Sequence, residues 1–133
     1  MALTPLSSPH VHSRASVSRV MSFVIFAMLP GCAAHLYFFG WGLLVTSTLA
    51  IATALICEAL VLRLRSRPVQ PALTDLSVVV TALLLAVALP PLSPWWITVI
   101  GTAFAVVFAK HLYGGLGFNP FNPAMVGYAM LLI

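Results

Sequence analysis

Charge is what this sequence has least of. Charged residues make up 6% of the chain, and Glu58 and Asp75 are its only acids. Soluble domains carry about 25% charged residues, so the composition argues against a water-soluble protein. The six Lys and Arg residues are spread along the chain, whereas a nucleic-acid-binding protein needs a clustered basic face. We therefore expect no nucleic-acid partner.

Cysteine and histidine are also too sparse for a metal or haem site. No Cys-x-x-Cys motif is present, and Cys32 and Cys57 fall in different apolar stretches. At ~1.5 Å per helical residue we place them roughly 10 Å apart in depth, beyond the ~7 Å limit for a disulfide. We expect two free thiols. His35 and His111 lie toward opposite membrane boundaries, so they cannot face each other across a haem.

Long apolar stretches dominate what remains, because 62% of the residues are hydrophobic. Crossing a bilayer takes about 20 apolar residues in a helix. Four stretches approach that length: 20–39, 41–62, 73–89 and 95–112. A fifth begins at Ala124 and covers only about 15 Å of the ~30 Å core before Ile133. The sequence predicts an all-α, polytopic helical membrane bundle with four transmembrane helices plus the start of a fifth.

The domain organisation follows from the same pattern. Residues 1–18 are polar and Ser-rich and form an N-terminal lead, and residues 19–133 form the transmembrane domain. A helix that stops in mid-bilayer is unusual, so we expect this chain to be a fragment of a longer subunit.

The positive residues predict the orientation of the bundle. All six fall on one side of the predicted spans: Arg14, Arg19, Arg63, Arg65, Arg67 and Lys110. Positive residues favour the cytoplasmic side, so we expect a cytoplasmic N-terminus. The opposite boundary carries the aromatic residues typical of a membrane interface. These are Tyr37, Phe38, Phe39, Trp41, Trp95 and Trp96.

The N-terminal apolar stretch has an alternative interpretation. Two arginines, a short apolar run and the motif Leu29-Pro30-Gly31-Cys32 resemble a cleaved lipoprotein signal. However, a mature secreted protein turns polar after the modified cysteine. Here the residues stay apolar through Trp41, which favours a retained transmembrane helix.

Both acids are candidates for an ion pathway. Glu58 ends a row of small residues at i+4 spacing in the second stretch, and an acid at membrane depth is a functional candidate. It either helps admit Na⁺ or H⁺, or reaches the interface and pairs with Arg65. Asp75 either caps the third helix or contributes to cation entry. For Ser77 and Thr81 we expect hydrogen bonds to their own helix.

The segment 114–123 is the strongest candidate for a binding site. Its sequence is Gly-Gly-Leu-Gly-Phe-Asn-Pro-Phe-Asn-Pro, and irregular backbone at membrane depth survives only where protein or a cavity covers it. The spacing does not match a dinucleotide-binding loop. Asn119 and Asn122 offer amide donors and acceptors, and Asn122 also suits the N-cap of the last helix, with Pro123 in its first turn.

The nearby side chains favour a planar ligand. Tyr113, Phe118 and Phe121 supply flat apolar surface. Flavin offers alternating C=O and N–H groups on one edge, which match amides. A quinone is the nearest competitor, but it offers only acceptors.

Residues 110–128 resemble the signature of the NqrB/RnfD family of electron-transport subunits. The segment reads Lys-His-Leu-Tyr-Gly-Gly-Leu-Gly-Phe-Asn-Pro-Phe-Asn-Pro-Ala-Met-Val-Gly-Tyr. The likeness also includes the segments 7–10, 38–42 and 90–96, and Glu58 before an Arg-rich turn. It covers nearly the whole chain and corresponds to the N-terminal part of the family.

The resemblance implies a multi-pass subunit of an Rnf-type complex in the bacterial inner membrane. Such a complex passes electrons between NADH and ferredoxin or a quinone-side acceptor, and it couples this to Na⁺ or H⁺ movement. Other Rnf subunits and the lipid bilayer would be its partners, and this chain alone would not be catalytic.

The resemblance also implies the site residues. Riboflavin would contact Asn119 and Asn122, with Gly114 and Gly115 as lining, and Glu58 would match the family's acid. The family's threonine attachment motif for FMN is absent from this chain. The alternative is a non-redox transporter or scaffold whose glycine loop only packs helices.

Overall fold

The computed structural model describes residues 16–133, and every regular element in that range is a helix. The elements are α1 (Val17–Phe39), α2 (Gly42–Leu64), α3 (Val69–Thr74), α4 (Ser77–Ala88), α5 (Trp95–Phe104), the π-helix η1 (Ala105–His111) and α6 (Pro123–Leu131). The all-α prediction is confirmed for the described residues. Most of the polar lead, including Arg14 and the 7–10 segment, lies outside them.

The first two helices match the sequence expectation closely. Ser16 caps α1 by accepting a hydrogen bond from the Arg19 amide at 3.3 Å, and Gly40 ends it with a φ of 78°. α1 continues unbroken through Pro30. α1 and α2 each have 23 residues and are long and apolar enough to cross a membrane. α4 and the continuous α5–η1 segment are shorter apolar helices. The architecture is consistent with a membrane protein.

The third predicted span is not a single helix. The expectation of one helix over 73–89 is wrong, because α3 ends at Thr74 and α4 starts at Ser77. Leu76 adopts a left-handed conformation with a φ of 63°, which an α-helix cannot contain. The break shortens the apolar helix to 12 residues and turns the start of α4 toward the interior of the bundle.

The fourth predicted span changes its helical type halfway. α5 passes directly into η1, where the Leu112 amide donates to the Val107 carbonyl five residues earlier at 3.2 Å. π-turns are rare and frequently occur at functional sites. In this wide turn the consecutive side chains of Lys110 and His111 are both buried.

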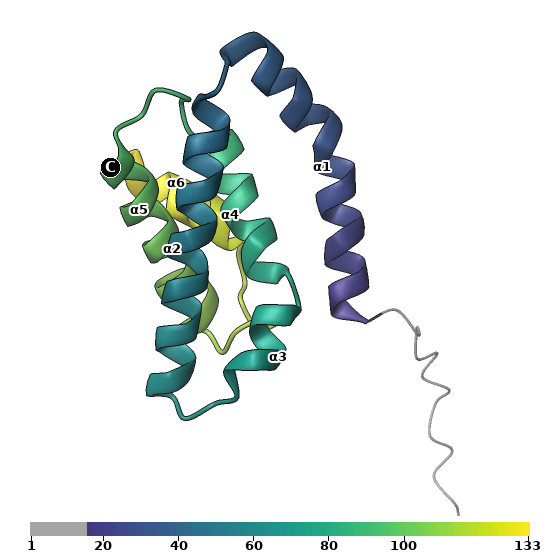
Figure 1. The fold of residues 1–133 in the computed structure, drawn as a ribbon. Helices are drawn as coiled ribbons and strands as arrows, with labels where there is room; N and C mark the ends of the chain where they lie inside the picture. Colours follow the sequence, from purple (N-terminus) through teal and green to yellow (C-terminus); the bar gives the residue numbers. More distant parts are fainter. Residues whose placement is uncertain (1–15) are drawn as a thin grey trace, which may run out of the picture.

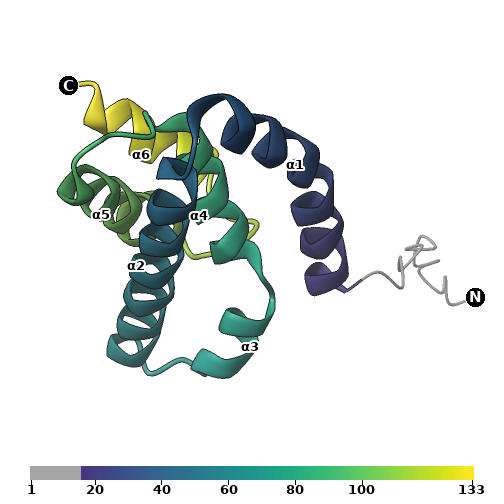
Figure 2. The same cartoon turned by 45° about the horizontal axis from the view of Figure 1, so that its top comes forward.

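The core lies between α2, α4 and η1, and Figure 1 shows α2 and α4 side by side. Small side chains fill it: Ala50, Ala54, Val78, Ala82, Ala86 and Val106. A second cluster, Leu85, Leu89 and Ala124, joins α4 to α6. α1 stands at the side of the bundle and buries none of its residues (Figures 1 and 2).

The two ends of the bundle differ in character. The turn after α2 with its arginines and the glycine loop lie at the lower end in Figure 1, and the α1–α2 turn and the α4–α5 loop lie at the upper end. The aromatic residues of the upper end are exposed, Trp41 at 76% and Trp95 at 65%.

Cys32 and Cys57 are both free, as expected.

Candidate functional site: a buried charge cluster beside a loop-lined cavity

A buried ion pair joins α2 to η1. The Lys110 ammonium on η1 donates to both carboxylate oxygens of Glu58 on α2, each at 2.8 Å. The two side chains are 3% and 1% exposed. Because an unpaired buried charge is costly, each of these groups makes the burial of the other possible.

Ser77 and Asp75 extend this ion pair into a chain of contacts. Lys110 Nζ donates its third hydrogen bond to Ser77 Oγ at 2.8 Å. Ser77 in turn donates its hydroxyl hydrogen to Asp75 Oδ1 at 2.6 Å, and its backbone amide donates to the same oxygen at 2.7 Å. The ammonium therefore has all three hydrogens bonded, and it lies between two carboxylates.

His111 lies beside the ion pair without completing it. Its Nε2 is 3.5 Å from Glu58 Oε1, and that nitrogen has no hydrogen-bond partner. At this separation the two atoms make an electrostatic contact at most.

These contacts test the structural alternatives for the acids. The alternative that Glu58 reaches the interface and pairs with Arg65 is wrong: Glu58 is buried with Lys110, and Arg65 is exposed. Asp75 does satisfy the first amide of α4, but from one residue before the N-cap position, which Leu76 occupies. Whether Glu58 and Asp75 form an ion pathway stays a prediction.

The serine and threonine of α4 behave differently from each other. Thr81 Oγ1 donates to the Ser77 carbonyl at 3.1 Å, as expected. The expectation for Ser77 is wrong, because its hydroxyl bridges Asp75 and Lys110 instead of bonding to its own helix.

The glycine loop next to this cluster requires its glycines. Gly114, Gly115 and Gly117 have φ values of 114°, 100° and 87°, which side chains with a Cβ rarely adopt. Asn122 caps α6 as predicted, since its Oδ1 accepts from the Ala124 amide at 2.9 Å with Pro123 in the first turn.

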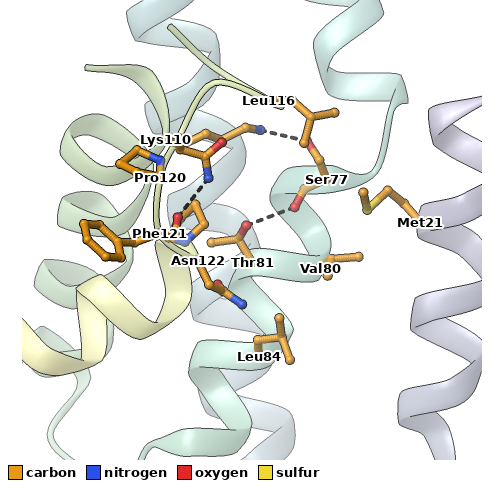
Figure 3. A pocket seen from close by; sticks show the side chains of 12 residues that line it. Met21, Ser77, Val80, Thr81, Leu84, Lys110, Leu116, Pro120, Phe121 and Asn122 are labelled. Atoms are coloured by element: carbon orange, nitrogen blue, oxygen red, sulfur yellow. Dashed lines mark hydrogen bonds between the residues drawn. The ribbon is translucent and has the colours of Figure 1, made fainter. Parts of the chain in front are cut away.

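A cavity of about 330 Å³ lies between the loop, α4 and α1 (Figure 3). Its polar lining comes from Ser77, Thr81, Lys110, Asn119 and Asn122. An apolar cavity of about 480 Å³ between α4 and α6 shares Leu84 and Asn122 with it. The two cavities are thus neighbours, one with a partly polar lining and one with an apolar lining.

The lining divides the predicted site residues into two groups. Asn119 and Asn122 line the polar cavity of about 330 Å³. Gly114 and Gly115 instead line a separate space of about 170 Å³ that contains Glu58, Asp75, Lys110 and His111. Of the predicted aromatic residues, only Phe121 lines this polar cavity. Tyr113 and Phe118 are exposed, at 56% and 76%.

Lys110 is the residue that sequence reasoning missed, because we counted it only as a mark of orientation. A signal for its role was present: Glu58 lies within an apolar stretch and needs a positive partner. Lys110 is the only positive residue that lies inside one of the four predicted stretches, the stretch 95–112. Met21 of α1 also lines the polar cavity of about 330 Å³, and nothing in the sequence indicated this. No cluster of metal-ligating side chains occurs within residues 16–133.

Comparison with known proteins identifies the family. Residues 4–133 match the NQR2, RnfD, RnfE family. The chain belongs to this family. The resemblance that the glycine-loop segment suggested is thereby confirmed.

The relatives of this chain are longer proteins, each the D subunit of an ion-translocating oxidoreductase complex. The chain is 58% identical to the protein of Escherichia fergusonii over 127 residues, which is 96% of this chain and 36% of that protein. The relative from Aliivibrio salmonicida is 58% identical over 133 residues, 100% of this chain and 38% of that protein. The relative from Salmonella paratyphi A is 58% identical over 127 residues, 96% of this chain and 36% of that protein. The chain thus spans little more than a third of these relatives and matches their N-terminal part.

Proposed function

We propose that this chain is the N-terminal part of a membrane subunit of an Rnf-type complex that couples electron transfer to Na⁺ or H⁺ translocation. In this proposal the polar cavity of about 330 Å³ holds a flavin, and other subunits of the complex cover the outer faces of the bundle. Family membership and the names of the relatives support the complex. The free groups of Asn119 and Asn122 are the observation that supports the flavin.

Each asparagine uses one half of its amide within the protein. Asn119 donates one Nδ2 hydrogen to the Phe121 carbonyl at 3.0 Å, which leaves its Oδ1 available as an acceptor. Asn122 uses Oδ1 for the α6 cap, which leaves its Nδ2 available as a donor. The cavity therefore offers an acceptor and a donor from neighbouring side chains.

This pair of groups fits a flavin better than a quinone. The pyrimidine edge of a flavin has an N–H flanked by two carbonyl groups, so it needs both an acceptor and donors. A quinone has no N–H to donate to the Asn119 oxygen, so it would use only the donor of Asn122 and not the acceptor of Asn119. Ligand sites typically measure about 300–1,000 Å³, and the polar cavity measures about 330 Å³ and shares Leu84 and Asn122 with the apolar one. A ring system with one polar edge and one apolar edge fits this shape.

The charge cluster supports the ion-translocating part of the proposal. Glu58 and Asp75 are connected through Lys110 and Ser77 at hydrogen-bond distances, and Lys110 also lines the cavity. A charge at membrane depth that contacts both spaces is suited to respond to the ligand. We further propose four spans and the start of a fifth, with a cytoplasmic N-terminus in a bacterial inner membrane.

Flavin content of the purified complex tests the cofactor. We expect Asn119→Ala to lower flavin occupancy, because the acceptor is removed. Asn122→Ser keeps an N-cap oxygen for α6 but removes the amide donors, so it should also lower occupancy while α6 stays intact. Losing one hydrogen bond worth about 1.4 kcal/mol weakens binding about tenfold.

The readout is the visible absorbance of the complex and the flavin released on denaturation, separated from any covalently held flavin. Gln70→Ala is the matched control, because it removes an exposed amide on α3 that lies outside the cavity. A colourless, fully assembled complex would favour the alternative of a non-redox transporter or scaffold. Equal non-covalent flavin in all variants would exclude this cavity as the flavin site.

A further inference from the structure

Lys110 forms part of the wall between two cavities. It lines the polar cavity of about 330 Å³ together with Asn119 and Asn122. It also lines the smaller cavity of about 170 Å³ together with Glu58 and Asp75. Leu116 is shared between the two linings as well. In Figure 3 the ammonium points toward Ser77, to which it is hydrogen-bonded. The flexible four-carbon stem of a lysine allows the ammonium to turn toward either space.

Three oxygen atoms converge on the point that the ammonium occupies. Glu58 Oε1, Glu58 Oε2 and Ser77 Oγ are each 2.8 Å from Lys110 Nζ. The hydroxyl hydrogen of Ser77 is committed to Asp75, so its oxygen lone pairs face this point. A carboxylate and an oriented hydroxyl are hard oxygen ligands, the type that alkali cations prefer.

We propose that these three oxygens form a monovalent cation site that Lys110 fills as a tethered cation. When the ligand of the polar cavity carries a negative charge, the Lys110 ammonium turns toward that ligand and a free cation such as Na⁺ takes its place. This inference rests on the proposed function for its ligand, and it adds the role of Lys110 as a positioning residue.

The exchange is coupled because Glu58 cannot remain alone. A buried carboxylate without a partner is costly, so departure of the ammonium requires arrival of a cation or a proton. Electrons delivered to a flavin by a carrier of the complex, without an equal number of protons, supply the negative charge. The other ionisable groups that line the smaller cavity are Asp75, Arg67 and His111. His111 Nε2 lies 3.5 Å from Glu58 Oε1, farther than the Lys110 ammonium at 2.8 Å, so Lys110 is the main partner of Glu58 in this arrangement.

Labelling of Glu58 with a hydrophobic carbodiimide, quantified by mass spectrometry on the intact complex, tests the proposal. Carbodiimides react with protonated carboxyl groups and not with a carboxylate that holds a cation. In the oxidised wild-type complex we expect little adduct, because Lys110 occupies the site. Lys110→Met should raise the adduct at least fivefold, and NaCl or LiCl should suppress it while choline chloride does not.

Ser77→Ala in the Lys110→Met background is the matched variant. It removes one of the three oxygens, so the cation concentration for half-suppression should rise severalfold. Labelling of the Lys110→Met complex that no alkali cation suppresses would overturn the cation site. Absence of any increase in labelling would overturn it as well.

A second measurement needs no substitution. Chemical reduction of the wild-type complex with a sodium-free reductant should increase Glu58 labelling in choline chloride, and NaCl should reverse the increase. Unchanged labelling at full flavin reduction would overturn the role of Lys110. A complex that contains no non-covalent flavin would contradict the proposed function instead, and the Lys110→Met experiment would still decide the cation site.

Discussion

The ion pair of Glu58 and Lys110 shows how one residue depends on another far away in the chain. The partners are 52 residues apart and are joined by bonds of 2.8 Å. A buried ion pair adds little net stability, because desolvation offsets the attraction. Breaking it by removing one partner costs about 3–5 kcal/mol. The pair therefore makes α2 and η1 depend on each other without making the bundle exceptionally stable.

This dependence predicts a non-additive result. Glu58→Gln and Lys110→Met should each lower the free energy of unfolding by about 3–5 kcal/mol. The double variant should lose much less than the sum of the two, because it leaves no unpaired charge. Unfolding of the purified subunit in detergent, followed by helical circular dichroism, measures the three values. If the double variant lost as much free energy of unfolding as the two single variants together, the two side chains would not be coupled.

Individual residues were predictable where their partners are local. The capping role of Asn122 follows from a bond to the amide two residues ahead, and the N-cap motif is visible in the sequence. The partner of Glu58 was predicted wrongly, since Arg65 is near in sequence but Lys110 is near in space. Only the folded arrangement of α2 against η1 shows which positive residue is buried.

At the scale of elements, α5 and α6 cross at two glycines. A Cβ at Gly127 would lie 2.7 Å from the Gly101 carbonyl oxygen and 2.8 Å from Ala105 Cβ. Both distances are too short for ordinary contact, and one obstacle is backbone that cannot rotate away. Small residues of this kind allow helices to approach closely in lipid.

Gly127→Ala should therefore push α6 away from α5 and destabilise the bundle by roughly 1–3 kcal/mol. Gly31→Ala in α1 is the control, because a Cβ there meets nothing within 4 Å. It should be neutral or should stabilise α1 by up to about 1 kcal/mol. Thermal unfolding of the complete subunit compares the two variants. Equal melting temperatures would show that the α5–α6 crossing does not need the glycine.

Helix boundaries were predictable where composition changes sharply. The first two predicted stretches agree with α1 and α2 to within three residues at each end. The break between α3 and α4 was missed, because Asp75 suits the cap of one continuous span and nothing in the sequence shows the left-handed φ of 63° at Leu76. The π-helix was missed for a related reason: the residues Ala105–His111 contain nothing that distinguishes a wide turn from an ordinary one.

At the scale of the whole molecule, the bundle has a basic end and an aromatic end. The arginine turn and the glycine loop share one end, and the exposed Trp41 and Trp95 mark the other (Figure 1). This arrangement agrees with the distribution of charges along the sequence. It supports the proposed orientation, in which the basic end faces the cytoplasm.

Cysteine labelling tests that orientation in the full-length subunit with Cys32 and Cys57 replaced by alanine. We expect Ser66→Cys, in the exposed arginine turn, to react with a membrane-impermeant maleimide only from the cytoplasmic side. Leu92→Cys, at a position 94% exposed, should react only from the periplasmic side. Labelling of both cysteines from one side would contradict the proposed topology.

The wide turn of η1 implies that the spacing of residues matters here as much as their identity. A π-turn holds one residue more than an α-turn, so one residue inserted into 105–109 could not be absorbed by an ordinary helix, in which each residue advances by about 100°. The Lys110 and His111 side chains would then rotate out of register with Glu58, although every member of the charge cluster would still be present. A single-residue insertion should thus disable the cluster as thoroughly as loss of the lysine itself.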